Sequence, residues 1–306
     1  MFGYILKRIL SMFITLFFIA TITFVMMHSI PGGPFTRDRA LPEQVEKALN
    51  EKYNLDAPLW EQYANYLKDL SVGNLGPSFQ KPGVTVNDMI GQGFPVSAKV
   101  GFIAVAFILI IGIPIGIISA LKQNTAIDHI VMVLATIGVT IPSFIIGTFM
   151  IYLFAEKLGW MPAGGLSSWK TYIGPVVSLA GFSLAFVTRL TRSSMLEVLR
   201  QDYIRTAKAN GLNRISIIGK HAMKNALIPV VTYVGPMVAS ILTGSFVVEK
   251  IFAIPGMGKY FVESVTNRDY TVIMGMTLFY AAIYIVMVLL VDIAYALIDP
   301  RIKLKQ

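Results

Sequence analysis

The chain has 306 residues, of which 55% are apolar and only 14% charged, with a formal net charge of +9 and no cysteine. Soluble domains carry roughly 25% charged residues, so this composition excludes a water-soluble globule and indicates a membrane protein. The lack of cysteine excludes disulfides, iron–sulfur clusters and thiol catalysis. No basic stripe is interleaved with aromatic residues outside the flanks of the apolar runs, which argues against nucleic-acid binding.

Apolar runs of about 20 residues, long enough to cross the hydrocarbon core of a bilayer, recur about six times. They extend approximately over Ile9–Ile30, Val100–Leu121, Ile130–Phe154, Tyr172–Val187, Leu227–Val248 and Val272–Ile298. The first run is too long for a signal-peptide core and lacks a small-x-small cleavage site, so we expect a retained anchor. The predicted fold is an all-α membrane protein with six transmembrane helices, forming a single domain over residues 1–306.

Basic residues in short loops indicate which side of the membrane is cytoplasmic. One side of the predicted topology holds Lys7, Arg8, Lys122, the basic residues between Arg189 and Lys224, Arg301, Lys303 and Lys305. The short loops of the other side hold only Lys157, Lys170, Lys250, Lys259 and Arg268. We therefore expect both termini in the cytoplasm, with the excess positive charge at membrane edges where it attracts anionic lipid.

Residues 31–95 form the only sizeable segment outside the predicted spans, and we expect them on the external side. Apolar residues at helical spacing predict two short amphipathic helices, from Pro42 to Tyr53 and from Pro58 to Leu70, with Pro58 in a first turn. The segment is too small to bury much core, so it is expected to rest on the outer ends of the spans or on a partner. A covering loop without a binding role is the alternative.

Ion-coupled carriers and intramembrane hydrolases need ionisable groups inside the bilayer, and the predicted spans hold few. The three histidines lie far apart in the sequence, so neither a metal site nor a Ser–His pair is predicted. Asp292 is the one carboxylate well inside a predicted span, and we expect a structural ion pair with Arg189 or Arg192; a proton relay is the alternative. No GxxxxGK[ST] sequence occurs, so the chain has no P-loop of its own.

Three prolines within the predicted spans, Pro114, Pro142 and Pro236, are expected to loosen or kink their helices. The backbone carbonyls that they free must face protein or a wet cavity. Neutral polar residues on the same runs are therefore candidates for lining a path for a polar solute. They are Thr140, Ser143, Thr232, Tyr233, Ser240, Thr243 and Ser245. The alternative is that each hydroxyl bonds to its own helix. Small residues such as Gly112 and Gly116 instead indicate close helix packing.

The polar segment 189–225 carries the sequence DYIRTAKANGL, which predicts a short helix. Asp202 is a suitable N-cap, and Gly211 suits the left-handed position that ends a helix. Asn213 or Ser216 can then start the next helix.

Two turns of helix are marginally stable in isolation, so we expect docking on another body to order this one. Tyr203, Ile204 and Ala207 are expected to face the dock, with Arg205 and Lys208 reaching acidic residues around it. An ordinary surface helix at the level of the lipid headgroups is the alternative.

The run from Asp202 to Leu212, followed by HAMKNALIP at residues 221–229, closely resembles the EAA-type loop of bacterial ABC-importer permeases of the oligopeptide, dipeptide and nickel branch. Arg205 and Thr206 stand where a Glu and the first Ala are usual, which is similar to the branch's own version of the loop. PGGP at 31–34, EKIFAIPGMG at 249–258, NRDY at 267–270 and DPR at 299–301 extend the resemblance over essentially the whole chain. The B-type subunits of oligopeptide permeases are the most similar.

The resemblance implies the type I importer architecture, with residues 31–95 as an extracytoplasmic segment, 189–225 as a cytoplasmic coupling loop and 249–271 as an extracytoplasmic re-entrant loop. It implies an ATPase-coupling helix made of Asp202, Tyr203, Ile204, Arg205, Thr206, Ala207, Lys208, Ala209 and Gly211. The implied partners are a homologous permease, two cytoplasmic ATPase subunits that bind ATP and Mg²⁺, an external solute-binding protein, membrane lipid and a peptide substrate. This chain, in a bacterial inner membrane, would bind no cofactor and catalyse no reaction.

If ATPase closure moves this helix, Ala207→Glu or Gly211→Leu should leave an assembled complex in which ATP hydrolysis no longer supports uptake. Dipeptide and nickel permeases share the loop signature and remain alternatives for the solute. An ion-coupled secondary carrier and a membrane enzyme remain alternatives of other classes. The lack of paired intramembrane charges disfavours the carrier, and the lack of a nucleophile–base pair or metal ligands disfavours the enzyme.

Overall fold

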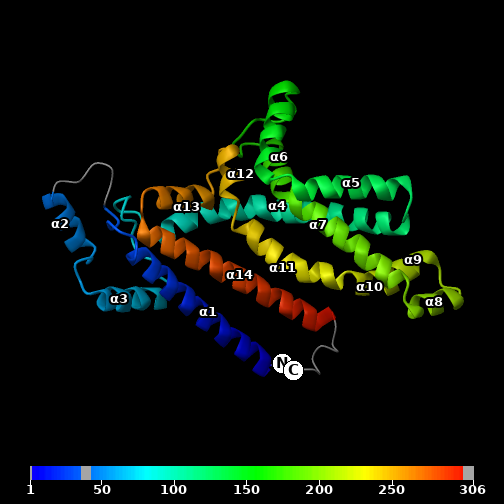
Figure 1. Cartoon of the computed structure of the whole chain (residues 1–306), viewed down its shortest axis with the longest axis horizontal. Helices are drawn as coiled ribbons and strands as arrows, with labels where there is room; N and C mark the ends of the chain where they lie inside the picture. Colours follow the sequence, from blue (N-terminus) through cyan, green and yellow to red (C-terminus); the bar gives the residue numbers. More distant parts are fainter. Residues whose placement is uncertain (1, 36–42, 299–306) are drawn as a thin grey trace. The chain divides into compact units, whose positions relative to one another are not determined.

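The computed structural model describes residues 2–35 and 43–298, and these are mainly helical (Figure 1). Within these residues no strand forms, and one isolated antiparallel bridge joins Pro77 to Thr85. The expected all-α fold is therefore confirmed. The chain divides into two compact units, one made of the residues up to Val96 together with Pro255–Ile285, the other of Ser97–Ile254 together with the residues from Val286 onward.

Five helices of the described ranges are long and apolar enough to cross a membrane, and they coincide with five of the six predicted runs. They are α1 (Phe2–His28), α4 (Val86–Leu121), α7 (Ile173–Leu199) preceded by the short helix η2 (Trp169–Tyr172), α11 (Ile228–Leu242) followed by α12 (Phe246–Ile251), and α14 (Tyr270–Ile298). The fourth predicted run is longer in the structure than predicted, because the helix continues from Val187 through polar residues to Leu199.

The third predicted run is not one straight helix. It consists of α5 (Ala126–Thr140) and α6 (Ser143–Met150), continued by the π-helix η1 (Ile151–Lys157), and the two parts are bent by 103° at the break. Pro142 lies at the break with φ −58° and ψ 143°, and Ile141 before it is extended. A proline disfavours helical backbone in the residue that precedes it and has no N–H to donate, so the helix ends there. The pair makes a sixth crossing if it counts as one span.

In the unit that contains α7, this helix is the centre of packing, since α5, α6, α11 and α12 all pack against it. Two glycines of α4 touch it closely. A Cβ at Gly112 would come within 3.3 Å of Leu184, and one at Gly116 within 2.7 Å of the Thr188 carbonyl. The packing role predicted for these glycines is confirmed.

The unit that contains α1 also holds α2 (Glu43–Lys52), α3 (Leu59–Ser71) and α13 (Met257–Thr266), with the first parts of α4 and α14. The two short helices predicted after the first span are thus present. Pro58 is the N-cap of α3, with ψ 144°, and does not lie in its first turn. The core of the unit is formed by Val86, Met89, Met257, Val272 and Met276.

Asp269, which is 3% exposed, ties the turn at residues 78–80 to the start of α14. Its carboxylate accepts hydrogen bonds from the Ser78 hydroxyl (2.5 Å) and from the backbone N–H groups of Phe79 (3.1 Å) and Gln80 (3.3 Å). Since a buried carboxylate is tolerated only when it is well hydrogen-bonded, this side chain fixes the turn firmly.

Candidate functional site

The predicted short helix after α7 is present as α8, Asp202–Ala209 (Figure 1). The expected N-cap is wrong by one residue. Gln201, with φ −69° and ψ 150°, is the N-cap and makes no side-chain cap hydrogen bond, while Asp202 lies inside the first turn. There its negative charge is still favourable, because the N-terminus of a helix carries partial positive charge.

The end of α8 matches the prediction for Gly211, which has φ +74°. The N–H of Gly211 donates to the Lys208 carbonyl (3.0 Å) and the N–H of Leu212 donates to the Ala207 carbonyl (3.3 Å). These two bonds are the pattern of a Schellman motif. The motif needs one residue in the left-handed backbone conformation, which glycine adopts most easily. Asn213 then caps the next helix, α9 (Arg214–Ser216), since its Oδ1 accepts from the Ser216 N–H at 2.7 Å.

The apolar face of α8 packs into the chain itself. Ile204 is 0% exposed and Ala207 is 6% exposed. Both belong to a cluster with Ala120 of α4, Met195 of α7, Ile217 and Ala222 of the π-helix η3 (Ile217–Ala222) and Ala226 of α10 (Met223–Ala226).

The expectation that Ile204 and Ala207 face an external dock is therefore wrong. For Tyr203 it stays a prediction, since this side chain is 39% exposed and its hydroxyl accepts a hydrogen bond from the Asn225 amide at 2.8 Å. The chain returns under α8 through η3 and α10 and covers the apolar face. For the same reason Ala207→Glu would place a charge in this chain's own core.

The outer face of α8, formed by Asp202, Arg205 and Thr206, is exposed and polar. Arg205 Nη1 lies 3.4 Å from Asp202 Oδ1, with the two side chains 75% and 94% exposed. An exposed pair of this kind contributes little to stability, so both charges remain available to a partner. Lys208 and Ala209 are exposed as well.

A buried ion pair holds the same end of the unit together and was not predicted. Asp128 of α5 is 2% exposed in its side chain and receives Arg192 of α7 through two bonds, Nε at 2.6 Å and Nη2 at 2.7 Å. The Ser119 hydroxyl (2.6 Å) and the Asn124 N–H (2.9 Å) complete the carboxylate's partners. Arg192 is thus engaged with Asp128. The side chain of Asp292 lies outside those described, so its ion pair with Arg189 or Arg192 stays a prediction.

Of the residues expected to line a solute path, three donate to their own helices. Thr140 donates to the carbonyls of Thr136 and Ile137, Thr232 to Ile228 and Thr243 to Ser240. Tyr233 donates to the Ser183 hydroxyl, and the Ser245 hydroxyl accepts from the Val248 N–H at the start of α12. None of these residues, nor Ser143 or Ser240, lines either of the two large cavities described below.

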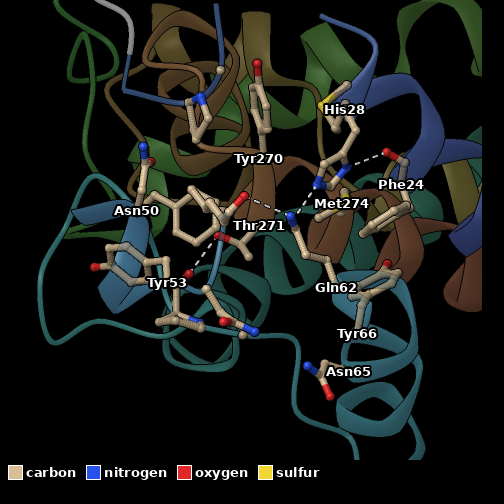
Figure 2. A pocket seen from close by; sticks show the side chains of 18 of the residues that line it. Phe24, His28, Asn50, Tyr53, Gln62, Asn65, Tyr66, Tyr270, Thr271 and Met274 are labelled. Carbon is tan, nitrogen blue, oxygen red and sulfur yellow. Dashed lines mark hydrogen bonds between the residues drawn. The ribbon is translucent and has the colours of Figure 1, made fainter. Parts of the chain in front are cut away.

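The unit that contains α1 holds a cavity of about 610 Å³ (Figure 2). Its walls come from α1, α2, α3 and the start of α14, and they are rich in aromatic and amide side chains, including Phe24, Tyr53, Gln62, Asn65 and Tyr270. This cavity was not predicted, because its walls come from segments far apart in the sequence.

His28 and Gln62 join α1 to α3 at this cavity. His28 Nε2 lies 3.2 Å from Gln62 Oε1, and the Gln62 amide donates to the carbonyls of Leu55 and Ala57. Burial raises the pKa of Tyr66 to about 12, so its hydroxyl stays protonated at neutral pH. The cavity wall is therefore polar and uncharged at Gln62 and Tyr66.

The helical fold, with apolar helices long enough to cross a bilayer, defines a multi-pass membrane protein. The chain belongs to the family described as binding-protein-dependent transport system inner membrane component, whose model matches residues 112–304, and the model of that family's N-terminal region matches residues 1–105. The chain is accordingly a multi-pass protein of the bacterial inner membrane.

Curated relatives are similar over their whole length. A dipeptide transport system permease protein, DppB, of Bacillus subtilis is 53% identical, covering 98% of each chain. An oligopeptide transport system permease protein, OppB, of Salmonella typhimurium is 45% identical over 99% of this chain and 100% of the relative.

Among solved structures, an inward-facing MetNI methionine ABC transporter has a TM-score of 0.56 at 17% identity, covering 69% of this chain and 96% of the other. An amino acid ABC transporter crystallised with histidines has a TM-score of 0.50 at 20% identity, covering 70% of this chain and 94% of the other. At these identities the likeness supports a shared fold, which is that of ABC importer permeases.

Proposed function

We propose that this chain is a permease subunit of an ATP-driven peptide importer and that α8 is the helix through which ATPase subunits move it. The carrying observation is the geometry of α8, a short helix with one face fixed in the chain and the other free. The family membership and the relatives named for peptide transport support the same conclusion.

In this mechanism the outer face of α8 docks on an ATPase and its inner face passes the movement on. Ile204 and Ala207 contact residues of α4, α7, η3 and α10, so a displacement of α8 must displace those helix ends with it. Packed interiors have few voids and low compressibility, so they transmit such a displacement with little loss. Closure of the ATPases would thus be converted into rearrangement of the membrane helices.

The complex we propose contains a second, homologous permease, two ATPases that hold ATP and Mg²⁺, and an external solute-binding protein that delivers the peptide. This chain would bind neither cofactor nor metal. The basic residues of α8 and its flanks support placing this loop and both termini on the cytoplasmic side.

The test is charge reversal on the outer face, with Arg205→Glu in the reconstituted complex. Because the Arg205 side chain is 75% exposed, the variant should fold and assemble, while peptide uptake per ATP hydrolysed falls about tenfold or more through repulsion at the dock. Lys224→Glu, an equal change on an exposed residue of α10, is the matched control and should retain coupling. Normal coupling in Arg205→Glu, with an intact complex, would contradict the proposed dock.

Vesicle assays separate the remaining alternatives. Uptake that needs ATP inside and no ion gradient is expected for the importer, whereas uptake driven by an ion gradient alone would favour a secondary carrier. Competition between labelled dipeptides and longer peptides then measures the length range, since relatives named for both substrates match the whole chain.

A further inference from the structure

A second cavity of about 610 Å³ lies beside the inner side of α8 and takes no part in the proposed dock. Its floor is apolar and includes Ala120 of α4, Leu196 and Leu199 of α7, and Ile217 of η3. Its rim carries Arg200, Lys208 and Arg214. We call this cavity the basic groove. Its volume lies within the roughly 300–1,000 Å³ typical of ligand pockets.

The charges of the basic groove are all of one sign. No aspartate or glutamate lines it, and within the described part of the chain none of the ion pairs involves Arg200, Lys208 or Arg214. All three residues are exposed. Three cations around one hollow therefore create a positive potential that favours an anionic ligand.

The groove lies at the ends of two membrane helices. Leu121, the last residue of the candidate span Val86–Leu121, and Leu199, the last residue of the candidate span Trp169–Leu199, both line it. An apolar floor beneath a cationic rim, at the ends of two helices apolar enough to cross a membrane, matches a molecule with an anionic head and an apolar tail.

We infer that the basic groove binds an anionic phospholipid, with the phosphate among Arg200, Lys208 and Arg214 and the first acyl carbons on the apolar floor. An acidic ATPase segment is a poorer match, because of the α8 residues only Lys208 lines the groove, while Asp202, Arg205 and Thr206 do not. A lipid held there would contact both α8 and the end of α7, and so would stabilise the loop from the membrane side. The inference needs only that the helices lie in a bilayer, so it stands or falls separately from peptide transport.

The experiment compares two double variants of equal charge in the assembled complex. Arg200→Gln with Arg214→Gln removes two rim charges. Lys220→Gln with Lys224→Gln removes two exposed charges of the same loop outside the groove and is the control. After exchange into nanodiscs of mixed phosphatidylglycerol and phosphatidylcholine, and re-extraction, native mass spectrometry counts the phospholipids that stay bound to each complex.

We expect the wild type and the control to retain phosphatidylglycerol over phosphatidylcholine. The groove variant should retain about thirtyfold less, since each of the two basic residues removed contributes about 1 kcal/mol near a membrane surface. Equal retention by the groove variant and the control would overturn the inference. So would equal retention of the two lipids, or displacement of phosphatidylglycerol by inorganic phosphate at millimolar concentration. Loss of ATPase subunits from the groove variant, with lipid retention unchanged, would assign the groove to the ATPase instead.

Discussion

The loop around α8 and the segment around α3 are both polar insertions between apolar helices, yet they are held in different ways. α8 has only 8 residues, but Ile204 and Ala207 are fully or almost fully buried. α3 has 13 residues and none of them is buried. Hydrogen bonds and ring contacts, such as those of Thr21 with Tyr63 and of Phe24 with Tyr66, attach it to α1. The insertion that we propose transmits movement is packed against a core, whereas the insertion that lines a cavity is held at its edges.

The largest effect is expected from Ala207→Glu. Residue 207 is 6% exposed, so a charge there lacks a partner inside the cluster beneath α8. The free energy of unfolding should fall by roughly 3–5 kcal/mol. Thermal unfolding of the purified complex measures the loss. Ala209→Glu, on the exposed side of the same helix, is the control and should change the melting temperature little. Equal melting temperatures for the two variants would mean that α8 is not packed as described.

The next effect is expected in the other region, from Asp269→Ala. The variant leaves the Ser78 hydroxyl and the Phe79 and Gln80 N–H groups without their acceptor. The free energy of unfolding should fall by about 2–3 kcal/mol. Faster amide hydrogen exchange is expected around residues 78–80 and not in α8. Asp269→Asn keeps one acceptor oxygen and should restore part of the protection. Uniform loss of protection over the whole chain would contradict attachment at the edges.

A smaller effect is expected from Gly211→Leu. Nothing lies within 4 Å of an added Cβ, so the cost arises only from the φ of +74° and should be about 1–2 kcal/mol. The end of α8 should fray, as measured by hydrogen exchange of Gly211 and its neighbours. Gly219→Leu is the matched control, because Gly219 also has open space but no positive φ. Similar fraying in both variants would show that backbone conformation is not what ends α8.

The smallest effect is expected from Asn213→Ala, which removes the side-chain acceptor of the Ser216 N–H and should cost about 1 kcal/mol. The melting temperature of the complex should fall slightly. Asn213→Asp keeps the acceptor and should behave like the wild type. A loss as large as that of Ala207→Glu would mean that the cap, and not the buried face, holds the loop.

Features set by neighbouring residues could be predicted from the sequence. The apolar runs, the left-handed Gly211 and the cap at Asn213 each depend on a few consecutive residues, and the structure contains them. The break at Pro142 is also local, and the kink expected at this proline is confirmed by the bend of 103° between α5 and α6.

Features that join distant residues could not be predicted. Asp128 and Arg192 are 64 residues apart, and Ser78 and Asp269 are 191 apart. The prediction of what covers the apolar face of α8 was wrong for the same reason. Amphipathic spacing shows that a helix has an apolar face, but it does not show whether the cover is a partner or a returning segment of the same chain.

The separation of the two faces of α8 has a consequence for how such transporters diversify. Residues that fix the helix in the chain, such as Ile204 and Ala207, are distinct from those displayed outward, such as Arg205 and Thr206. With the proposed dock on the outer face, substitutions there can alter recognition of an ATPase without repacking the buried face. A permease with such a helix is then suited to exchanging one ATPase for another.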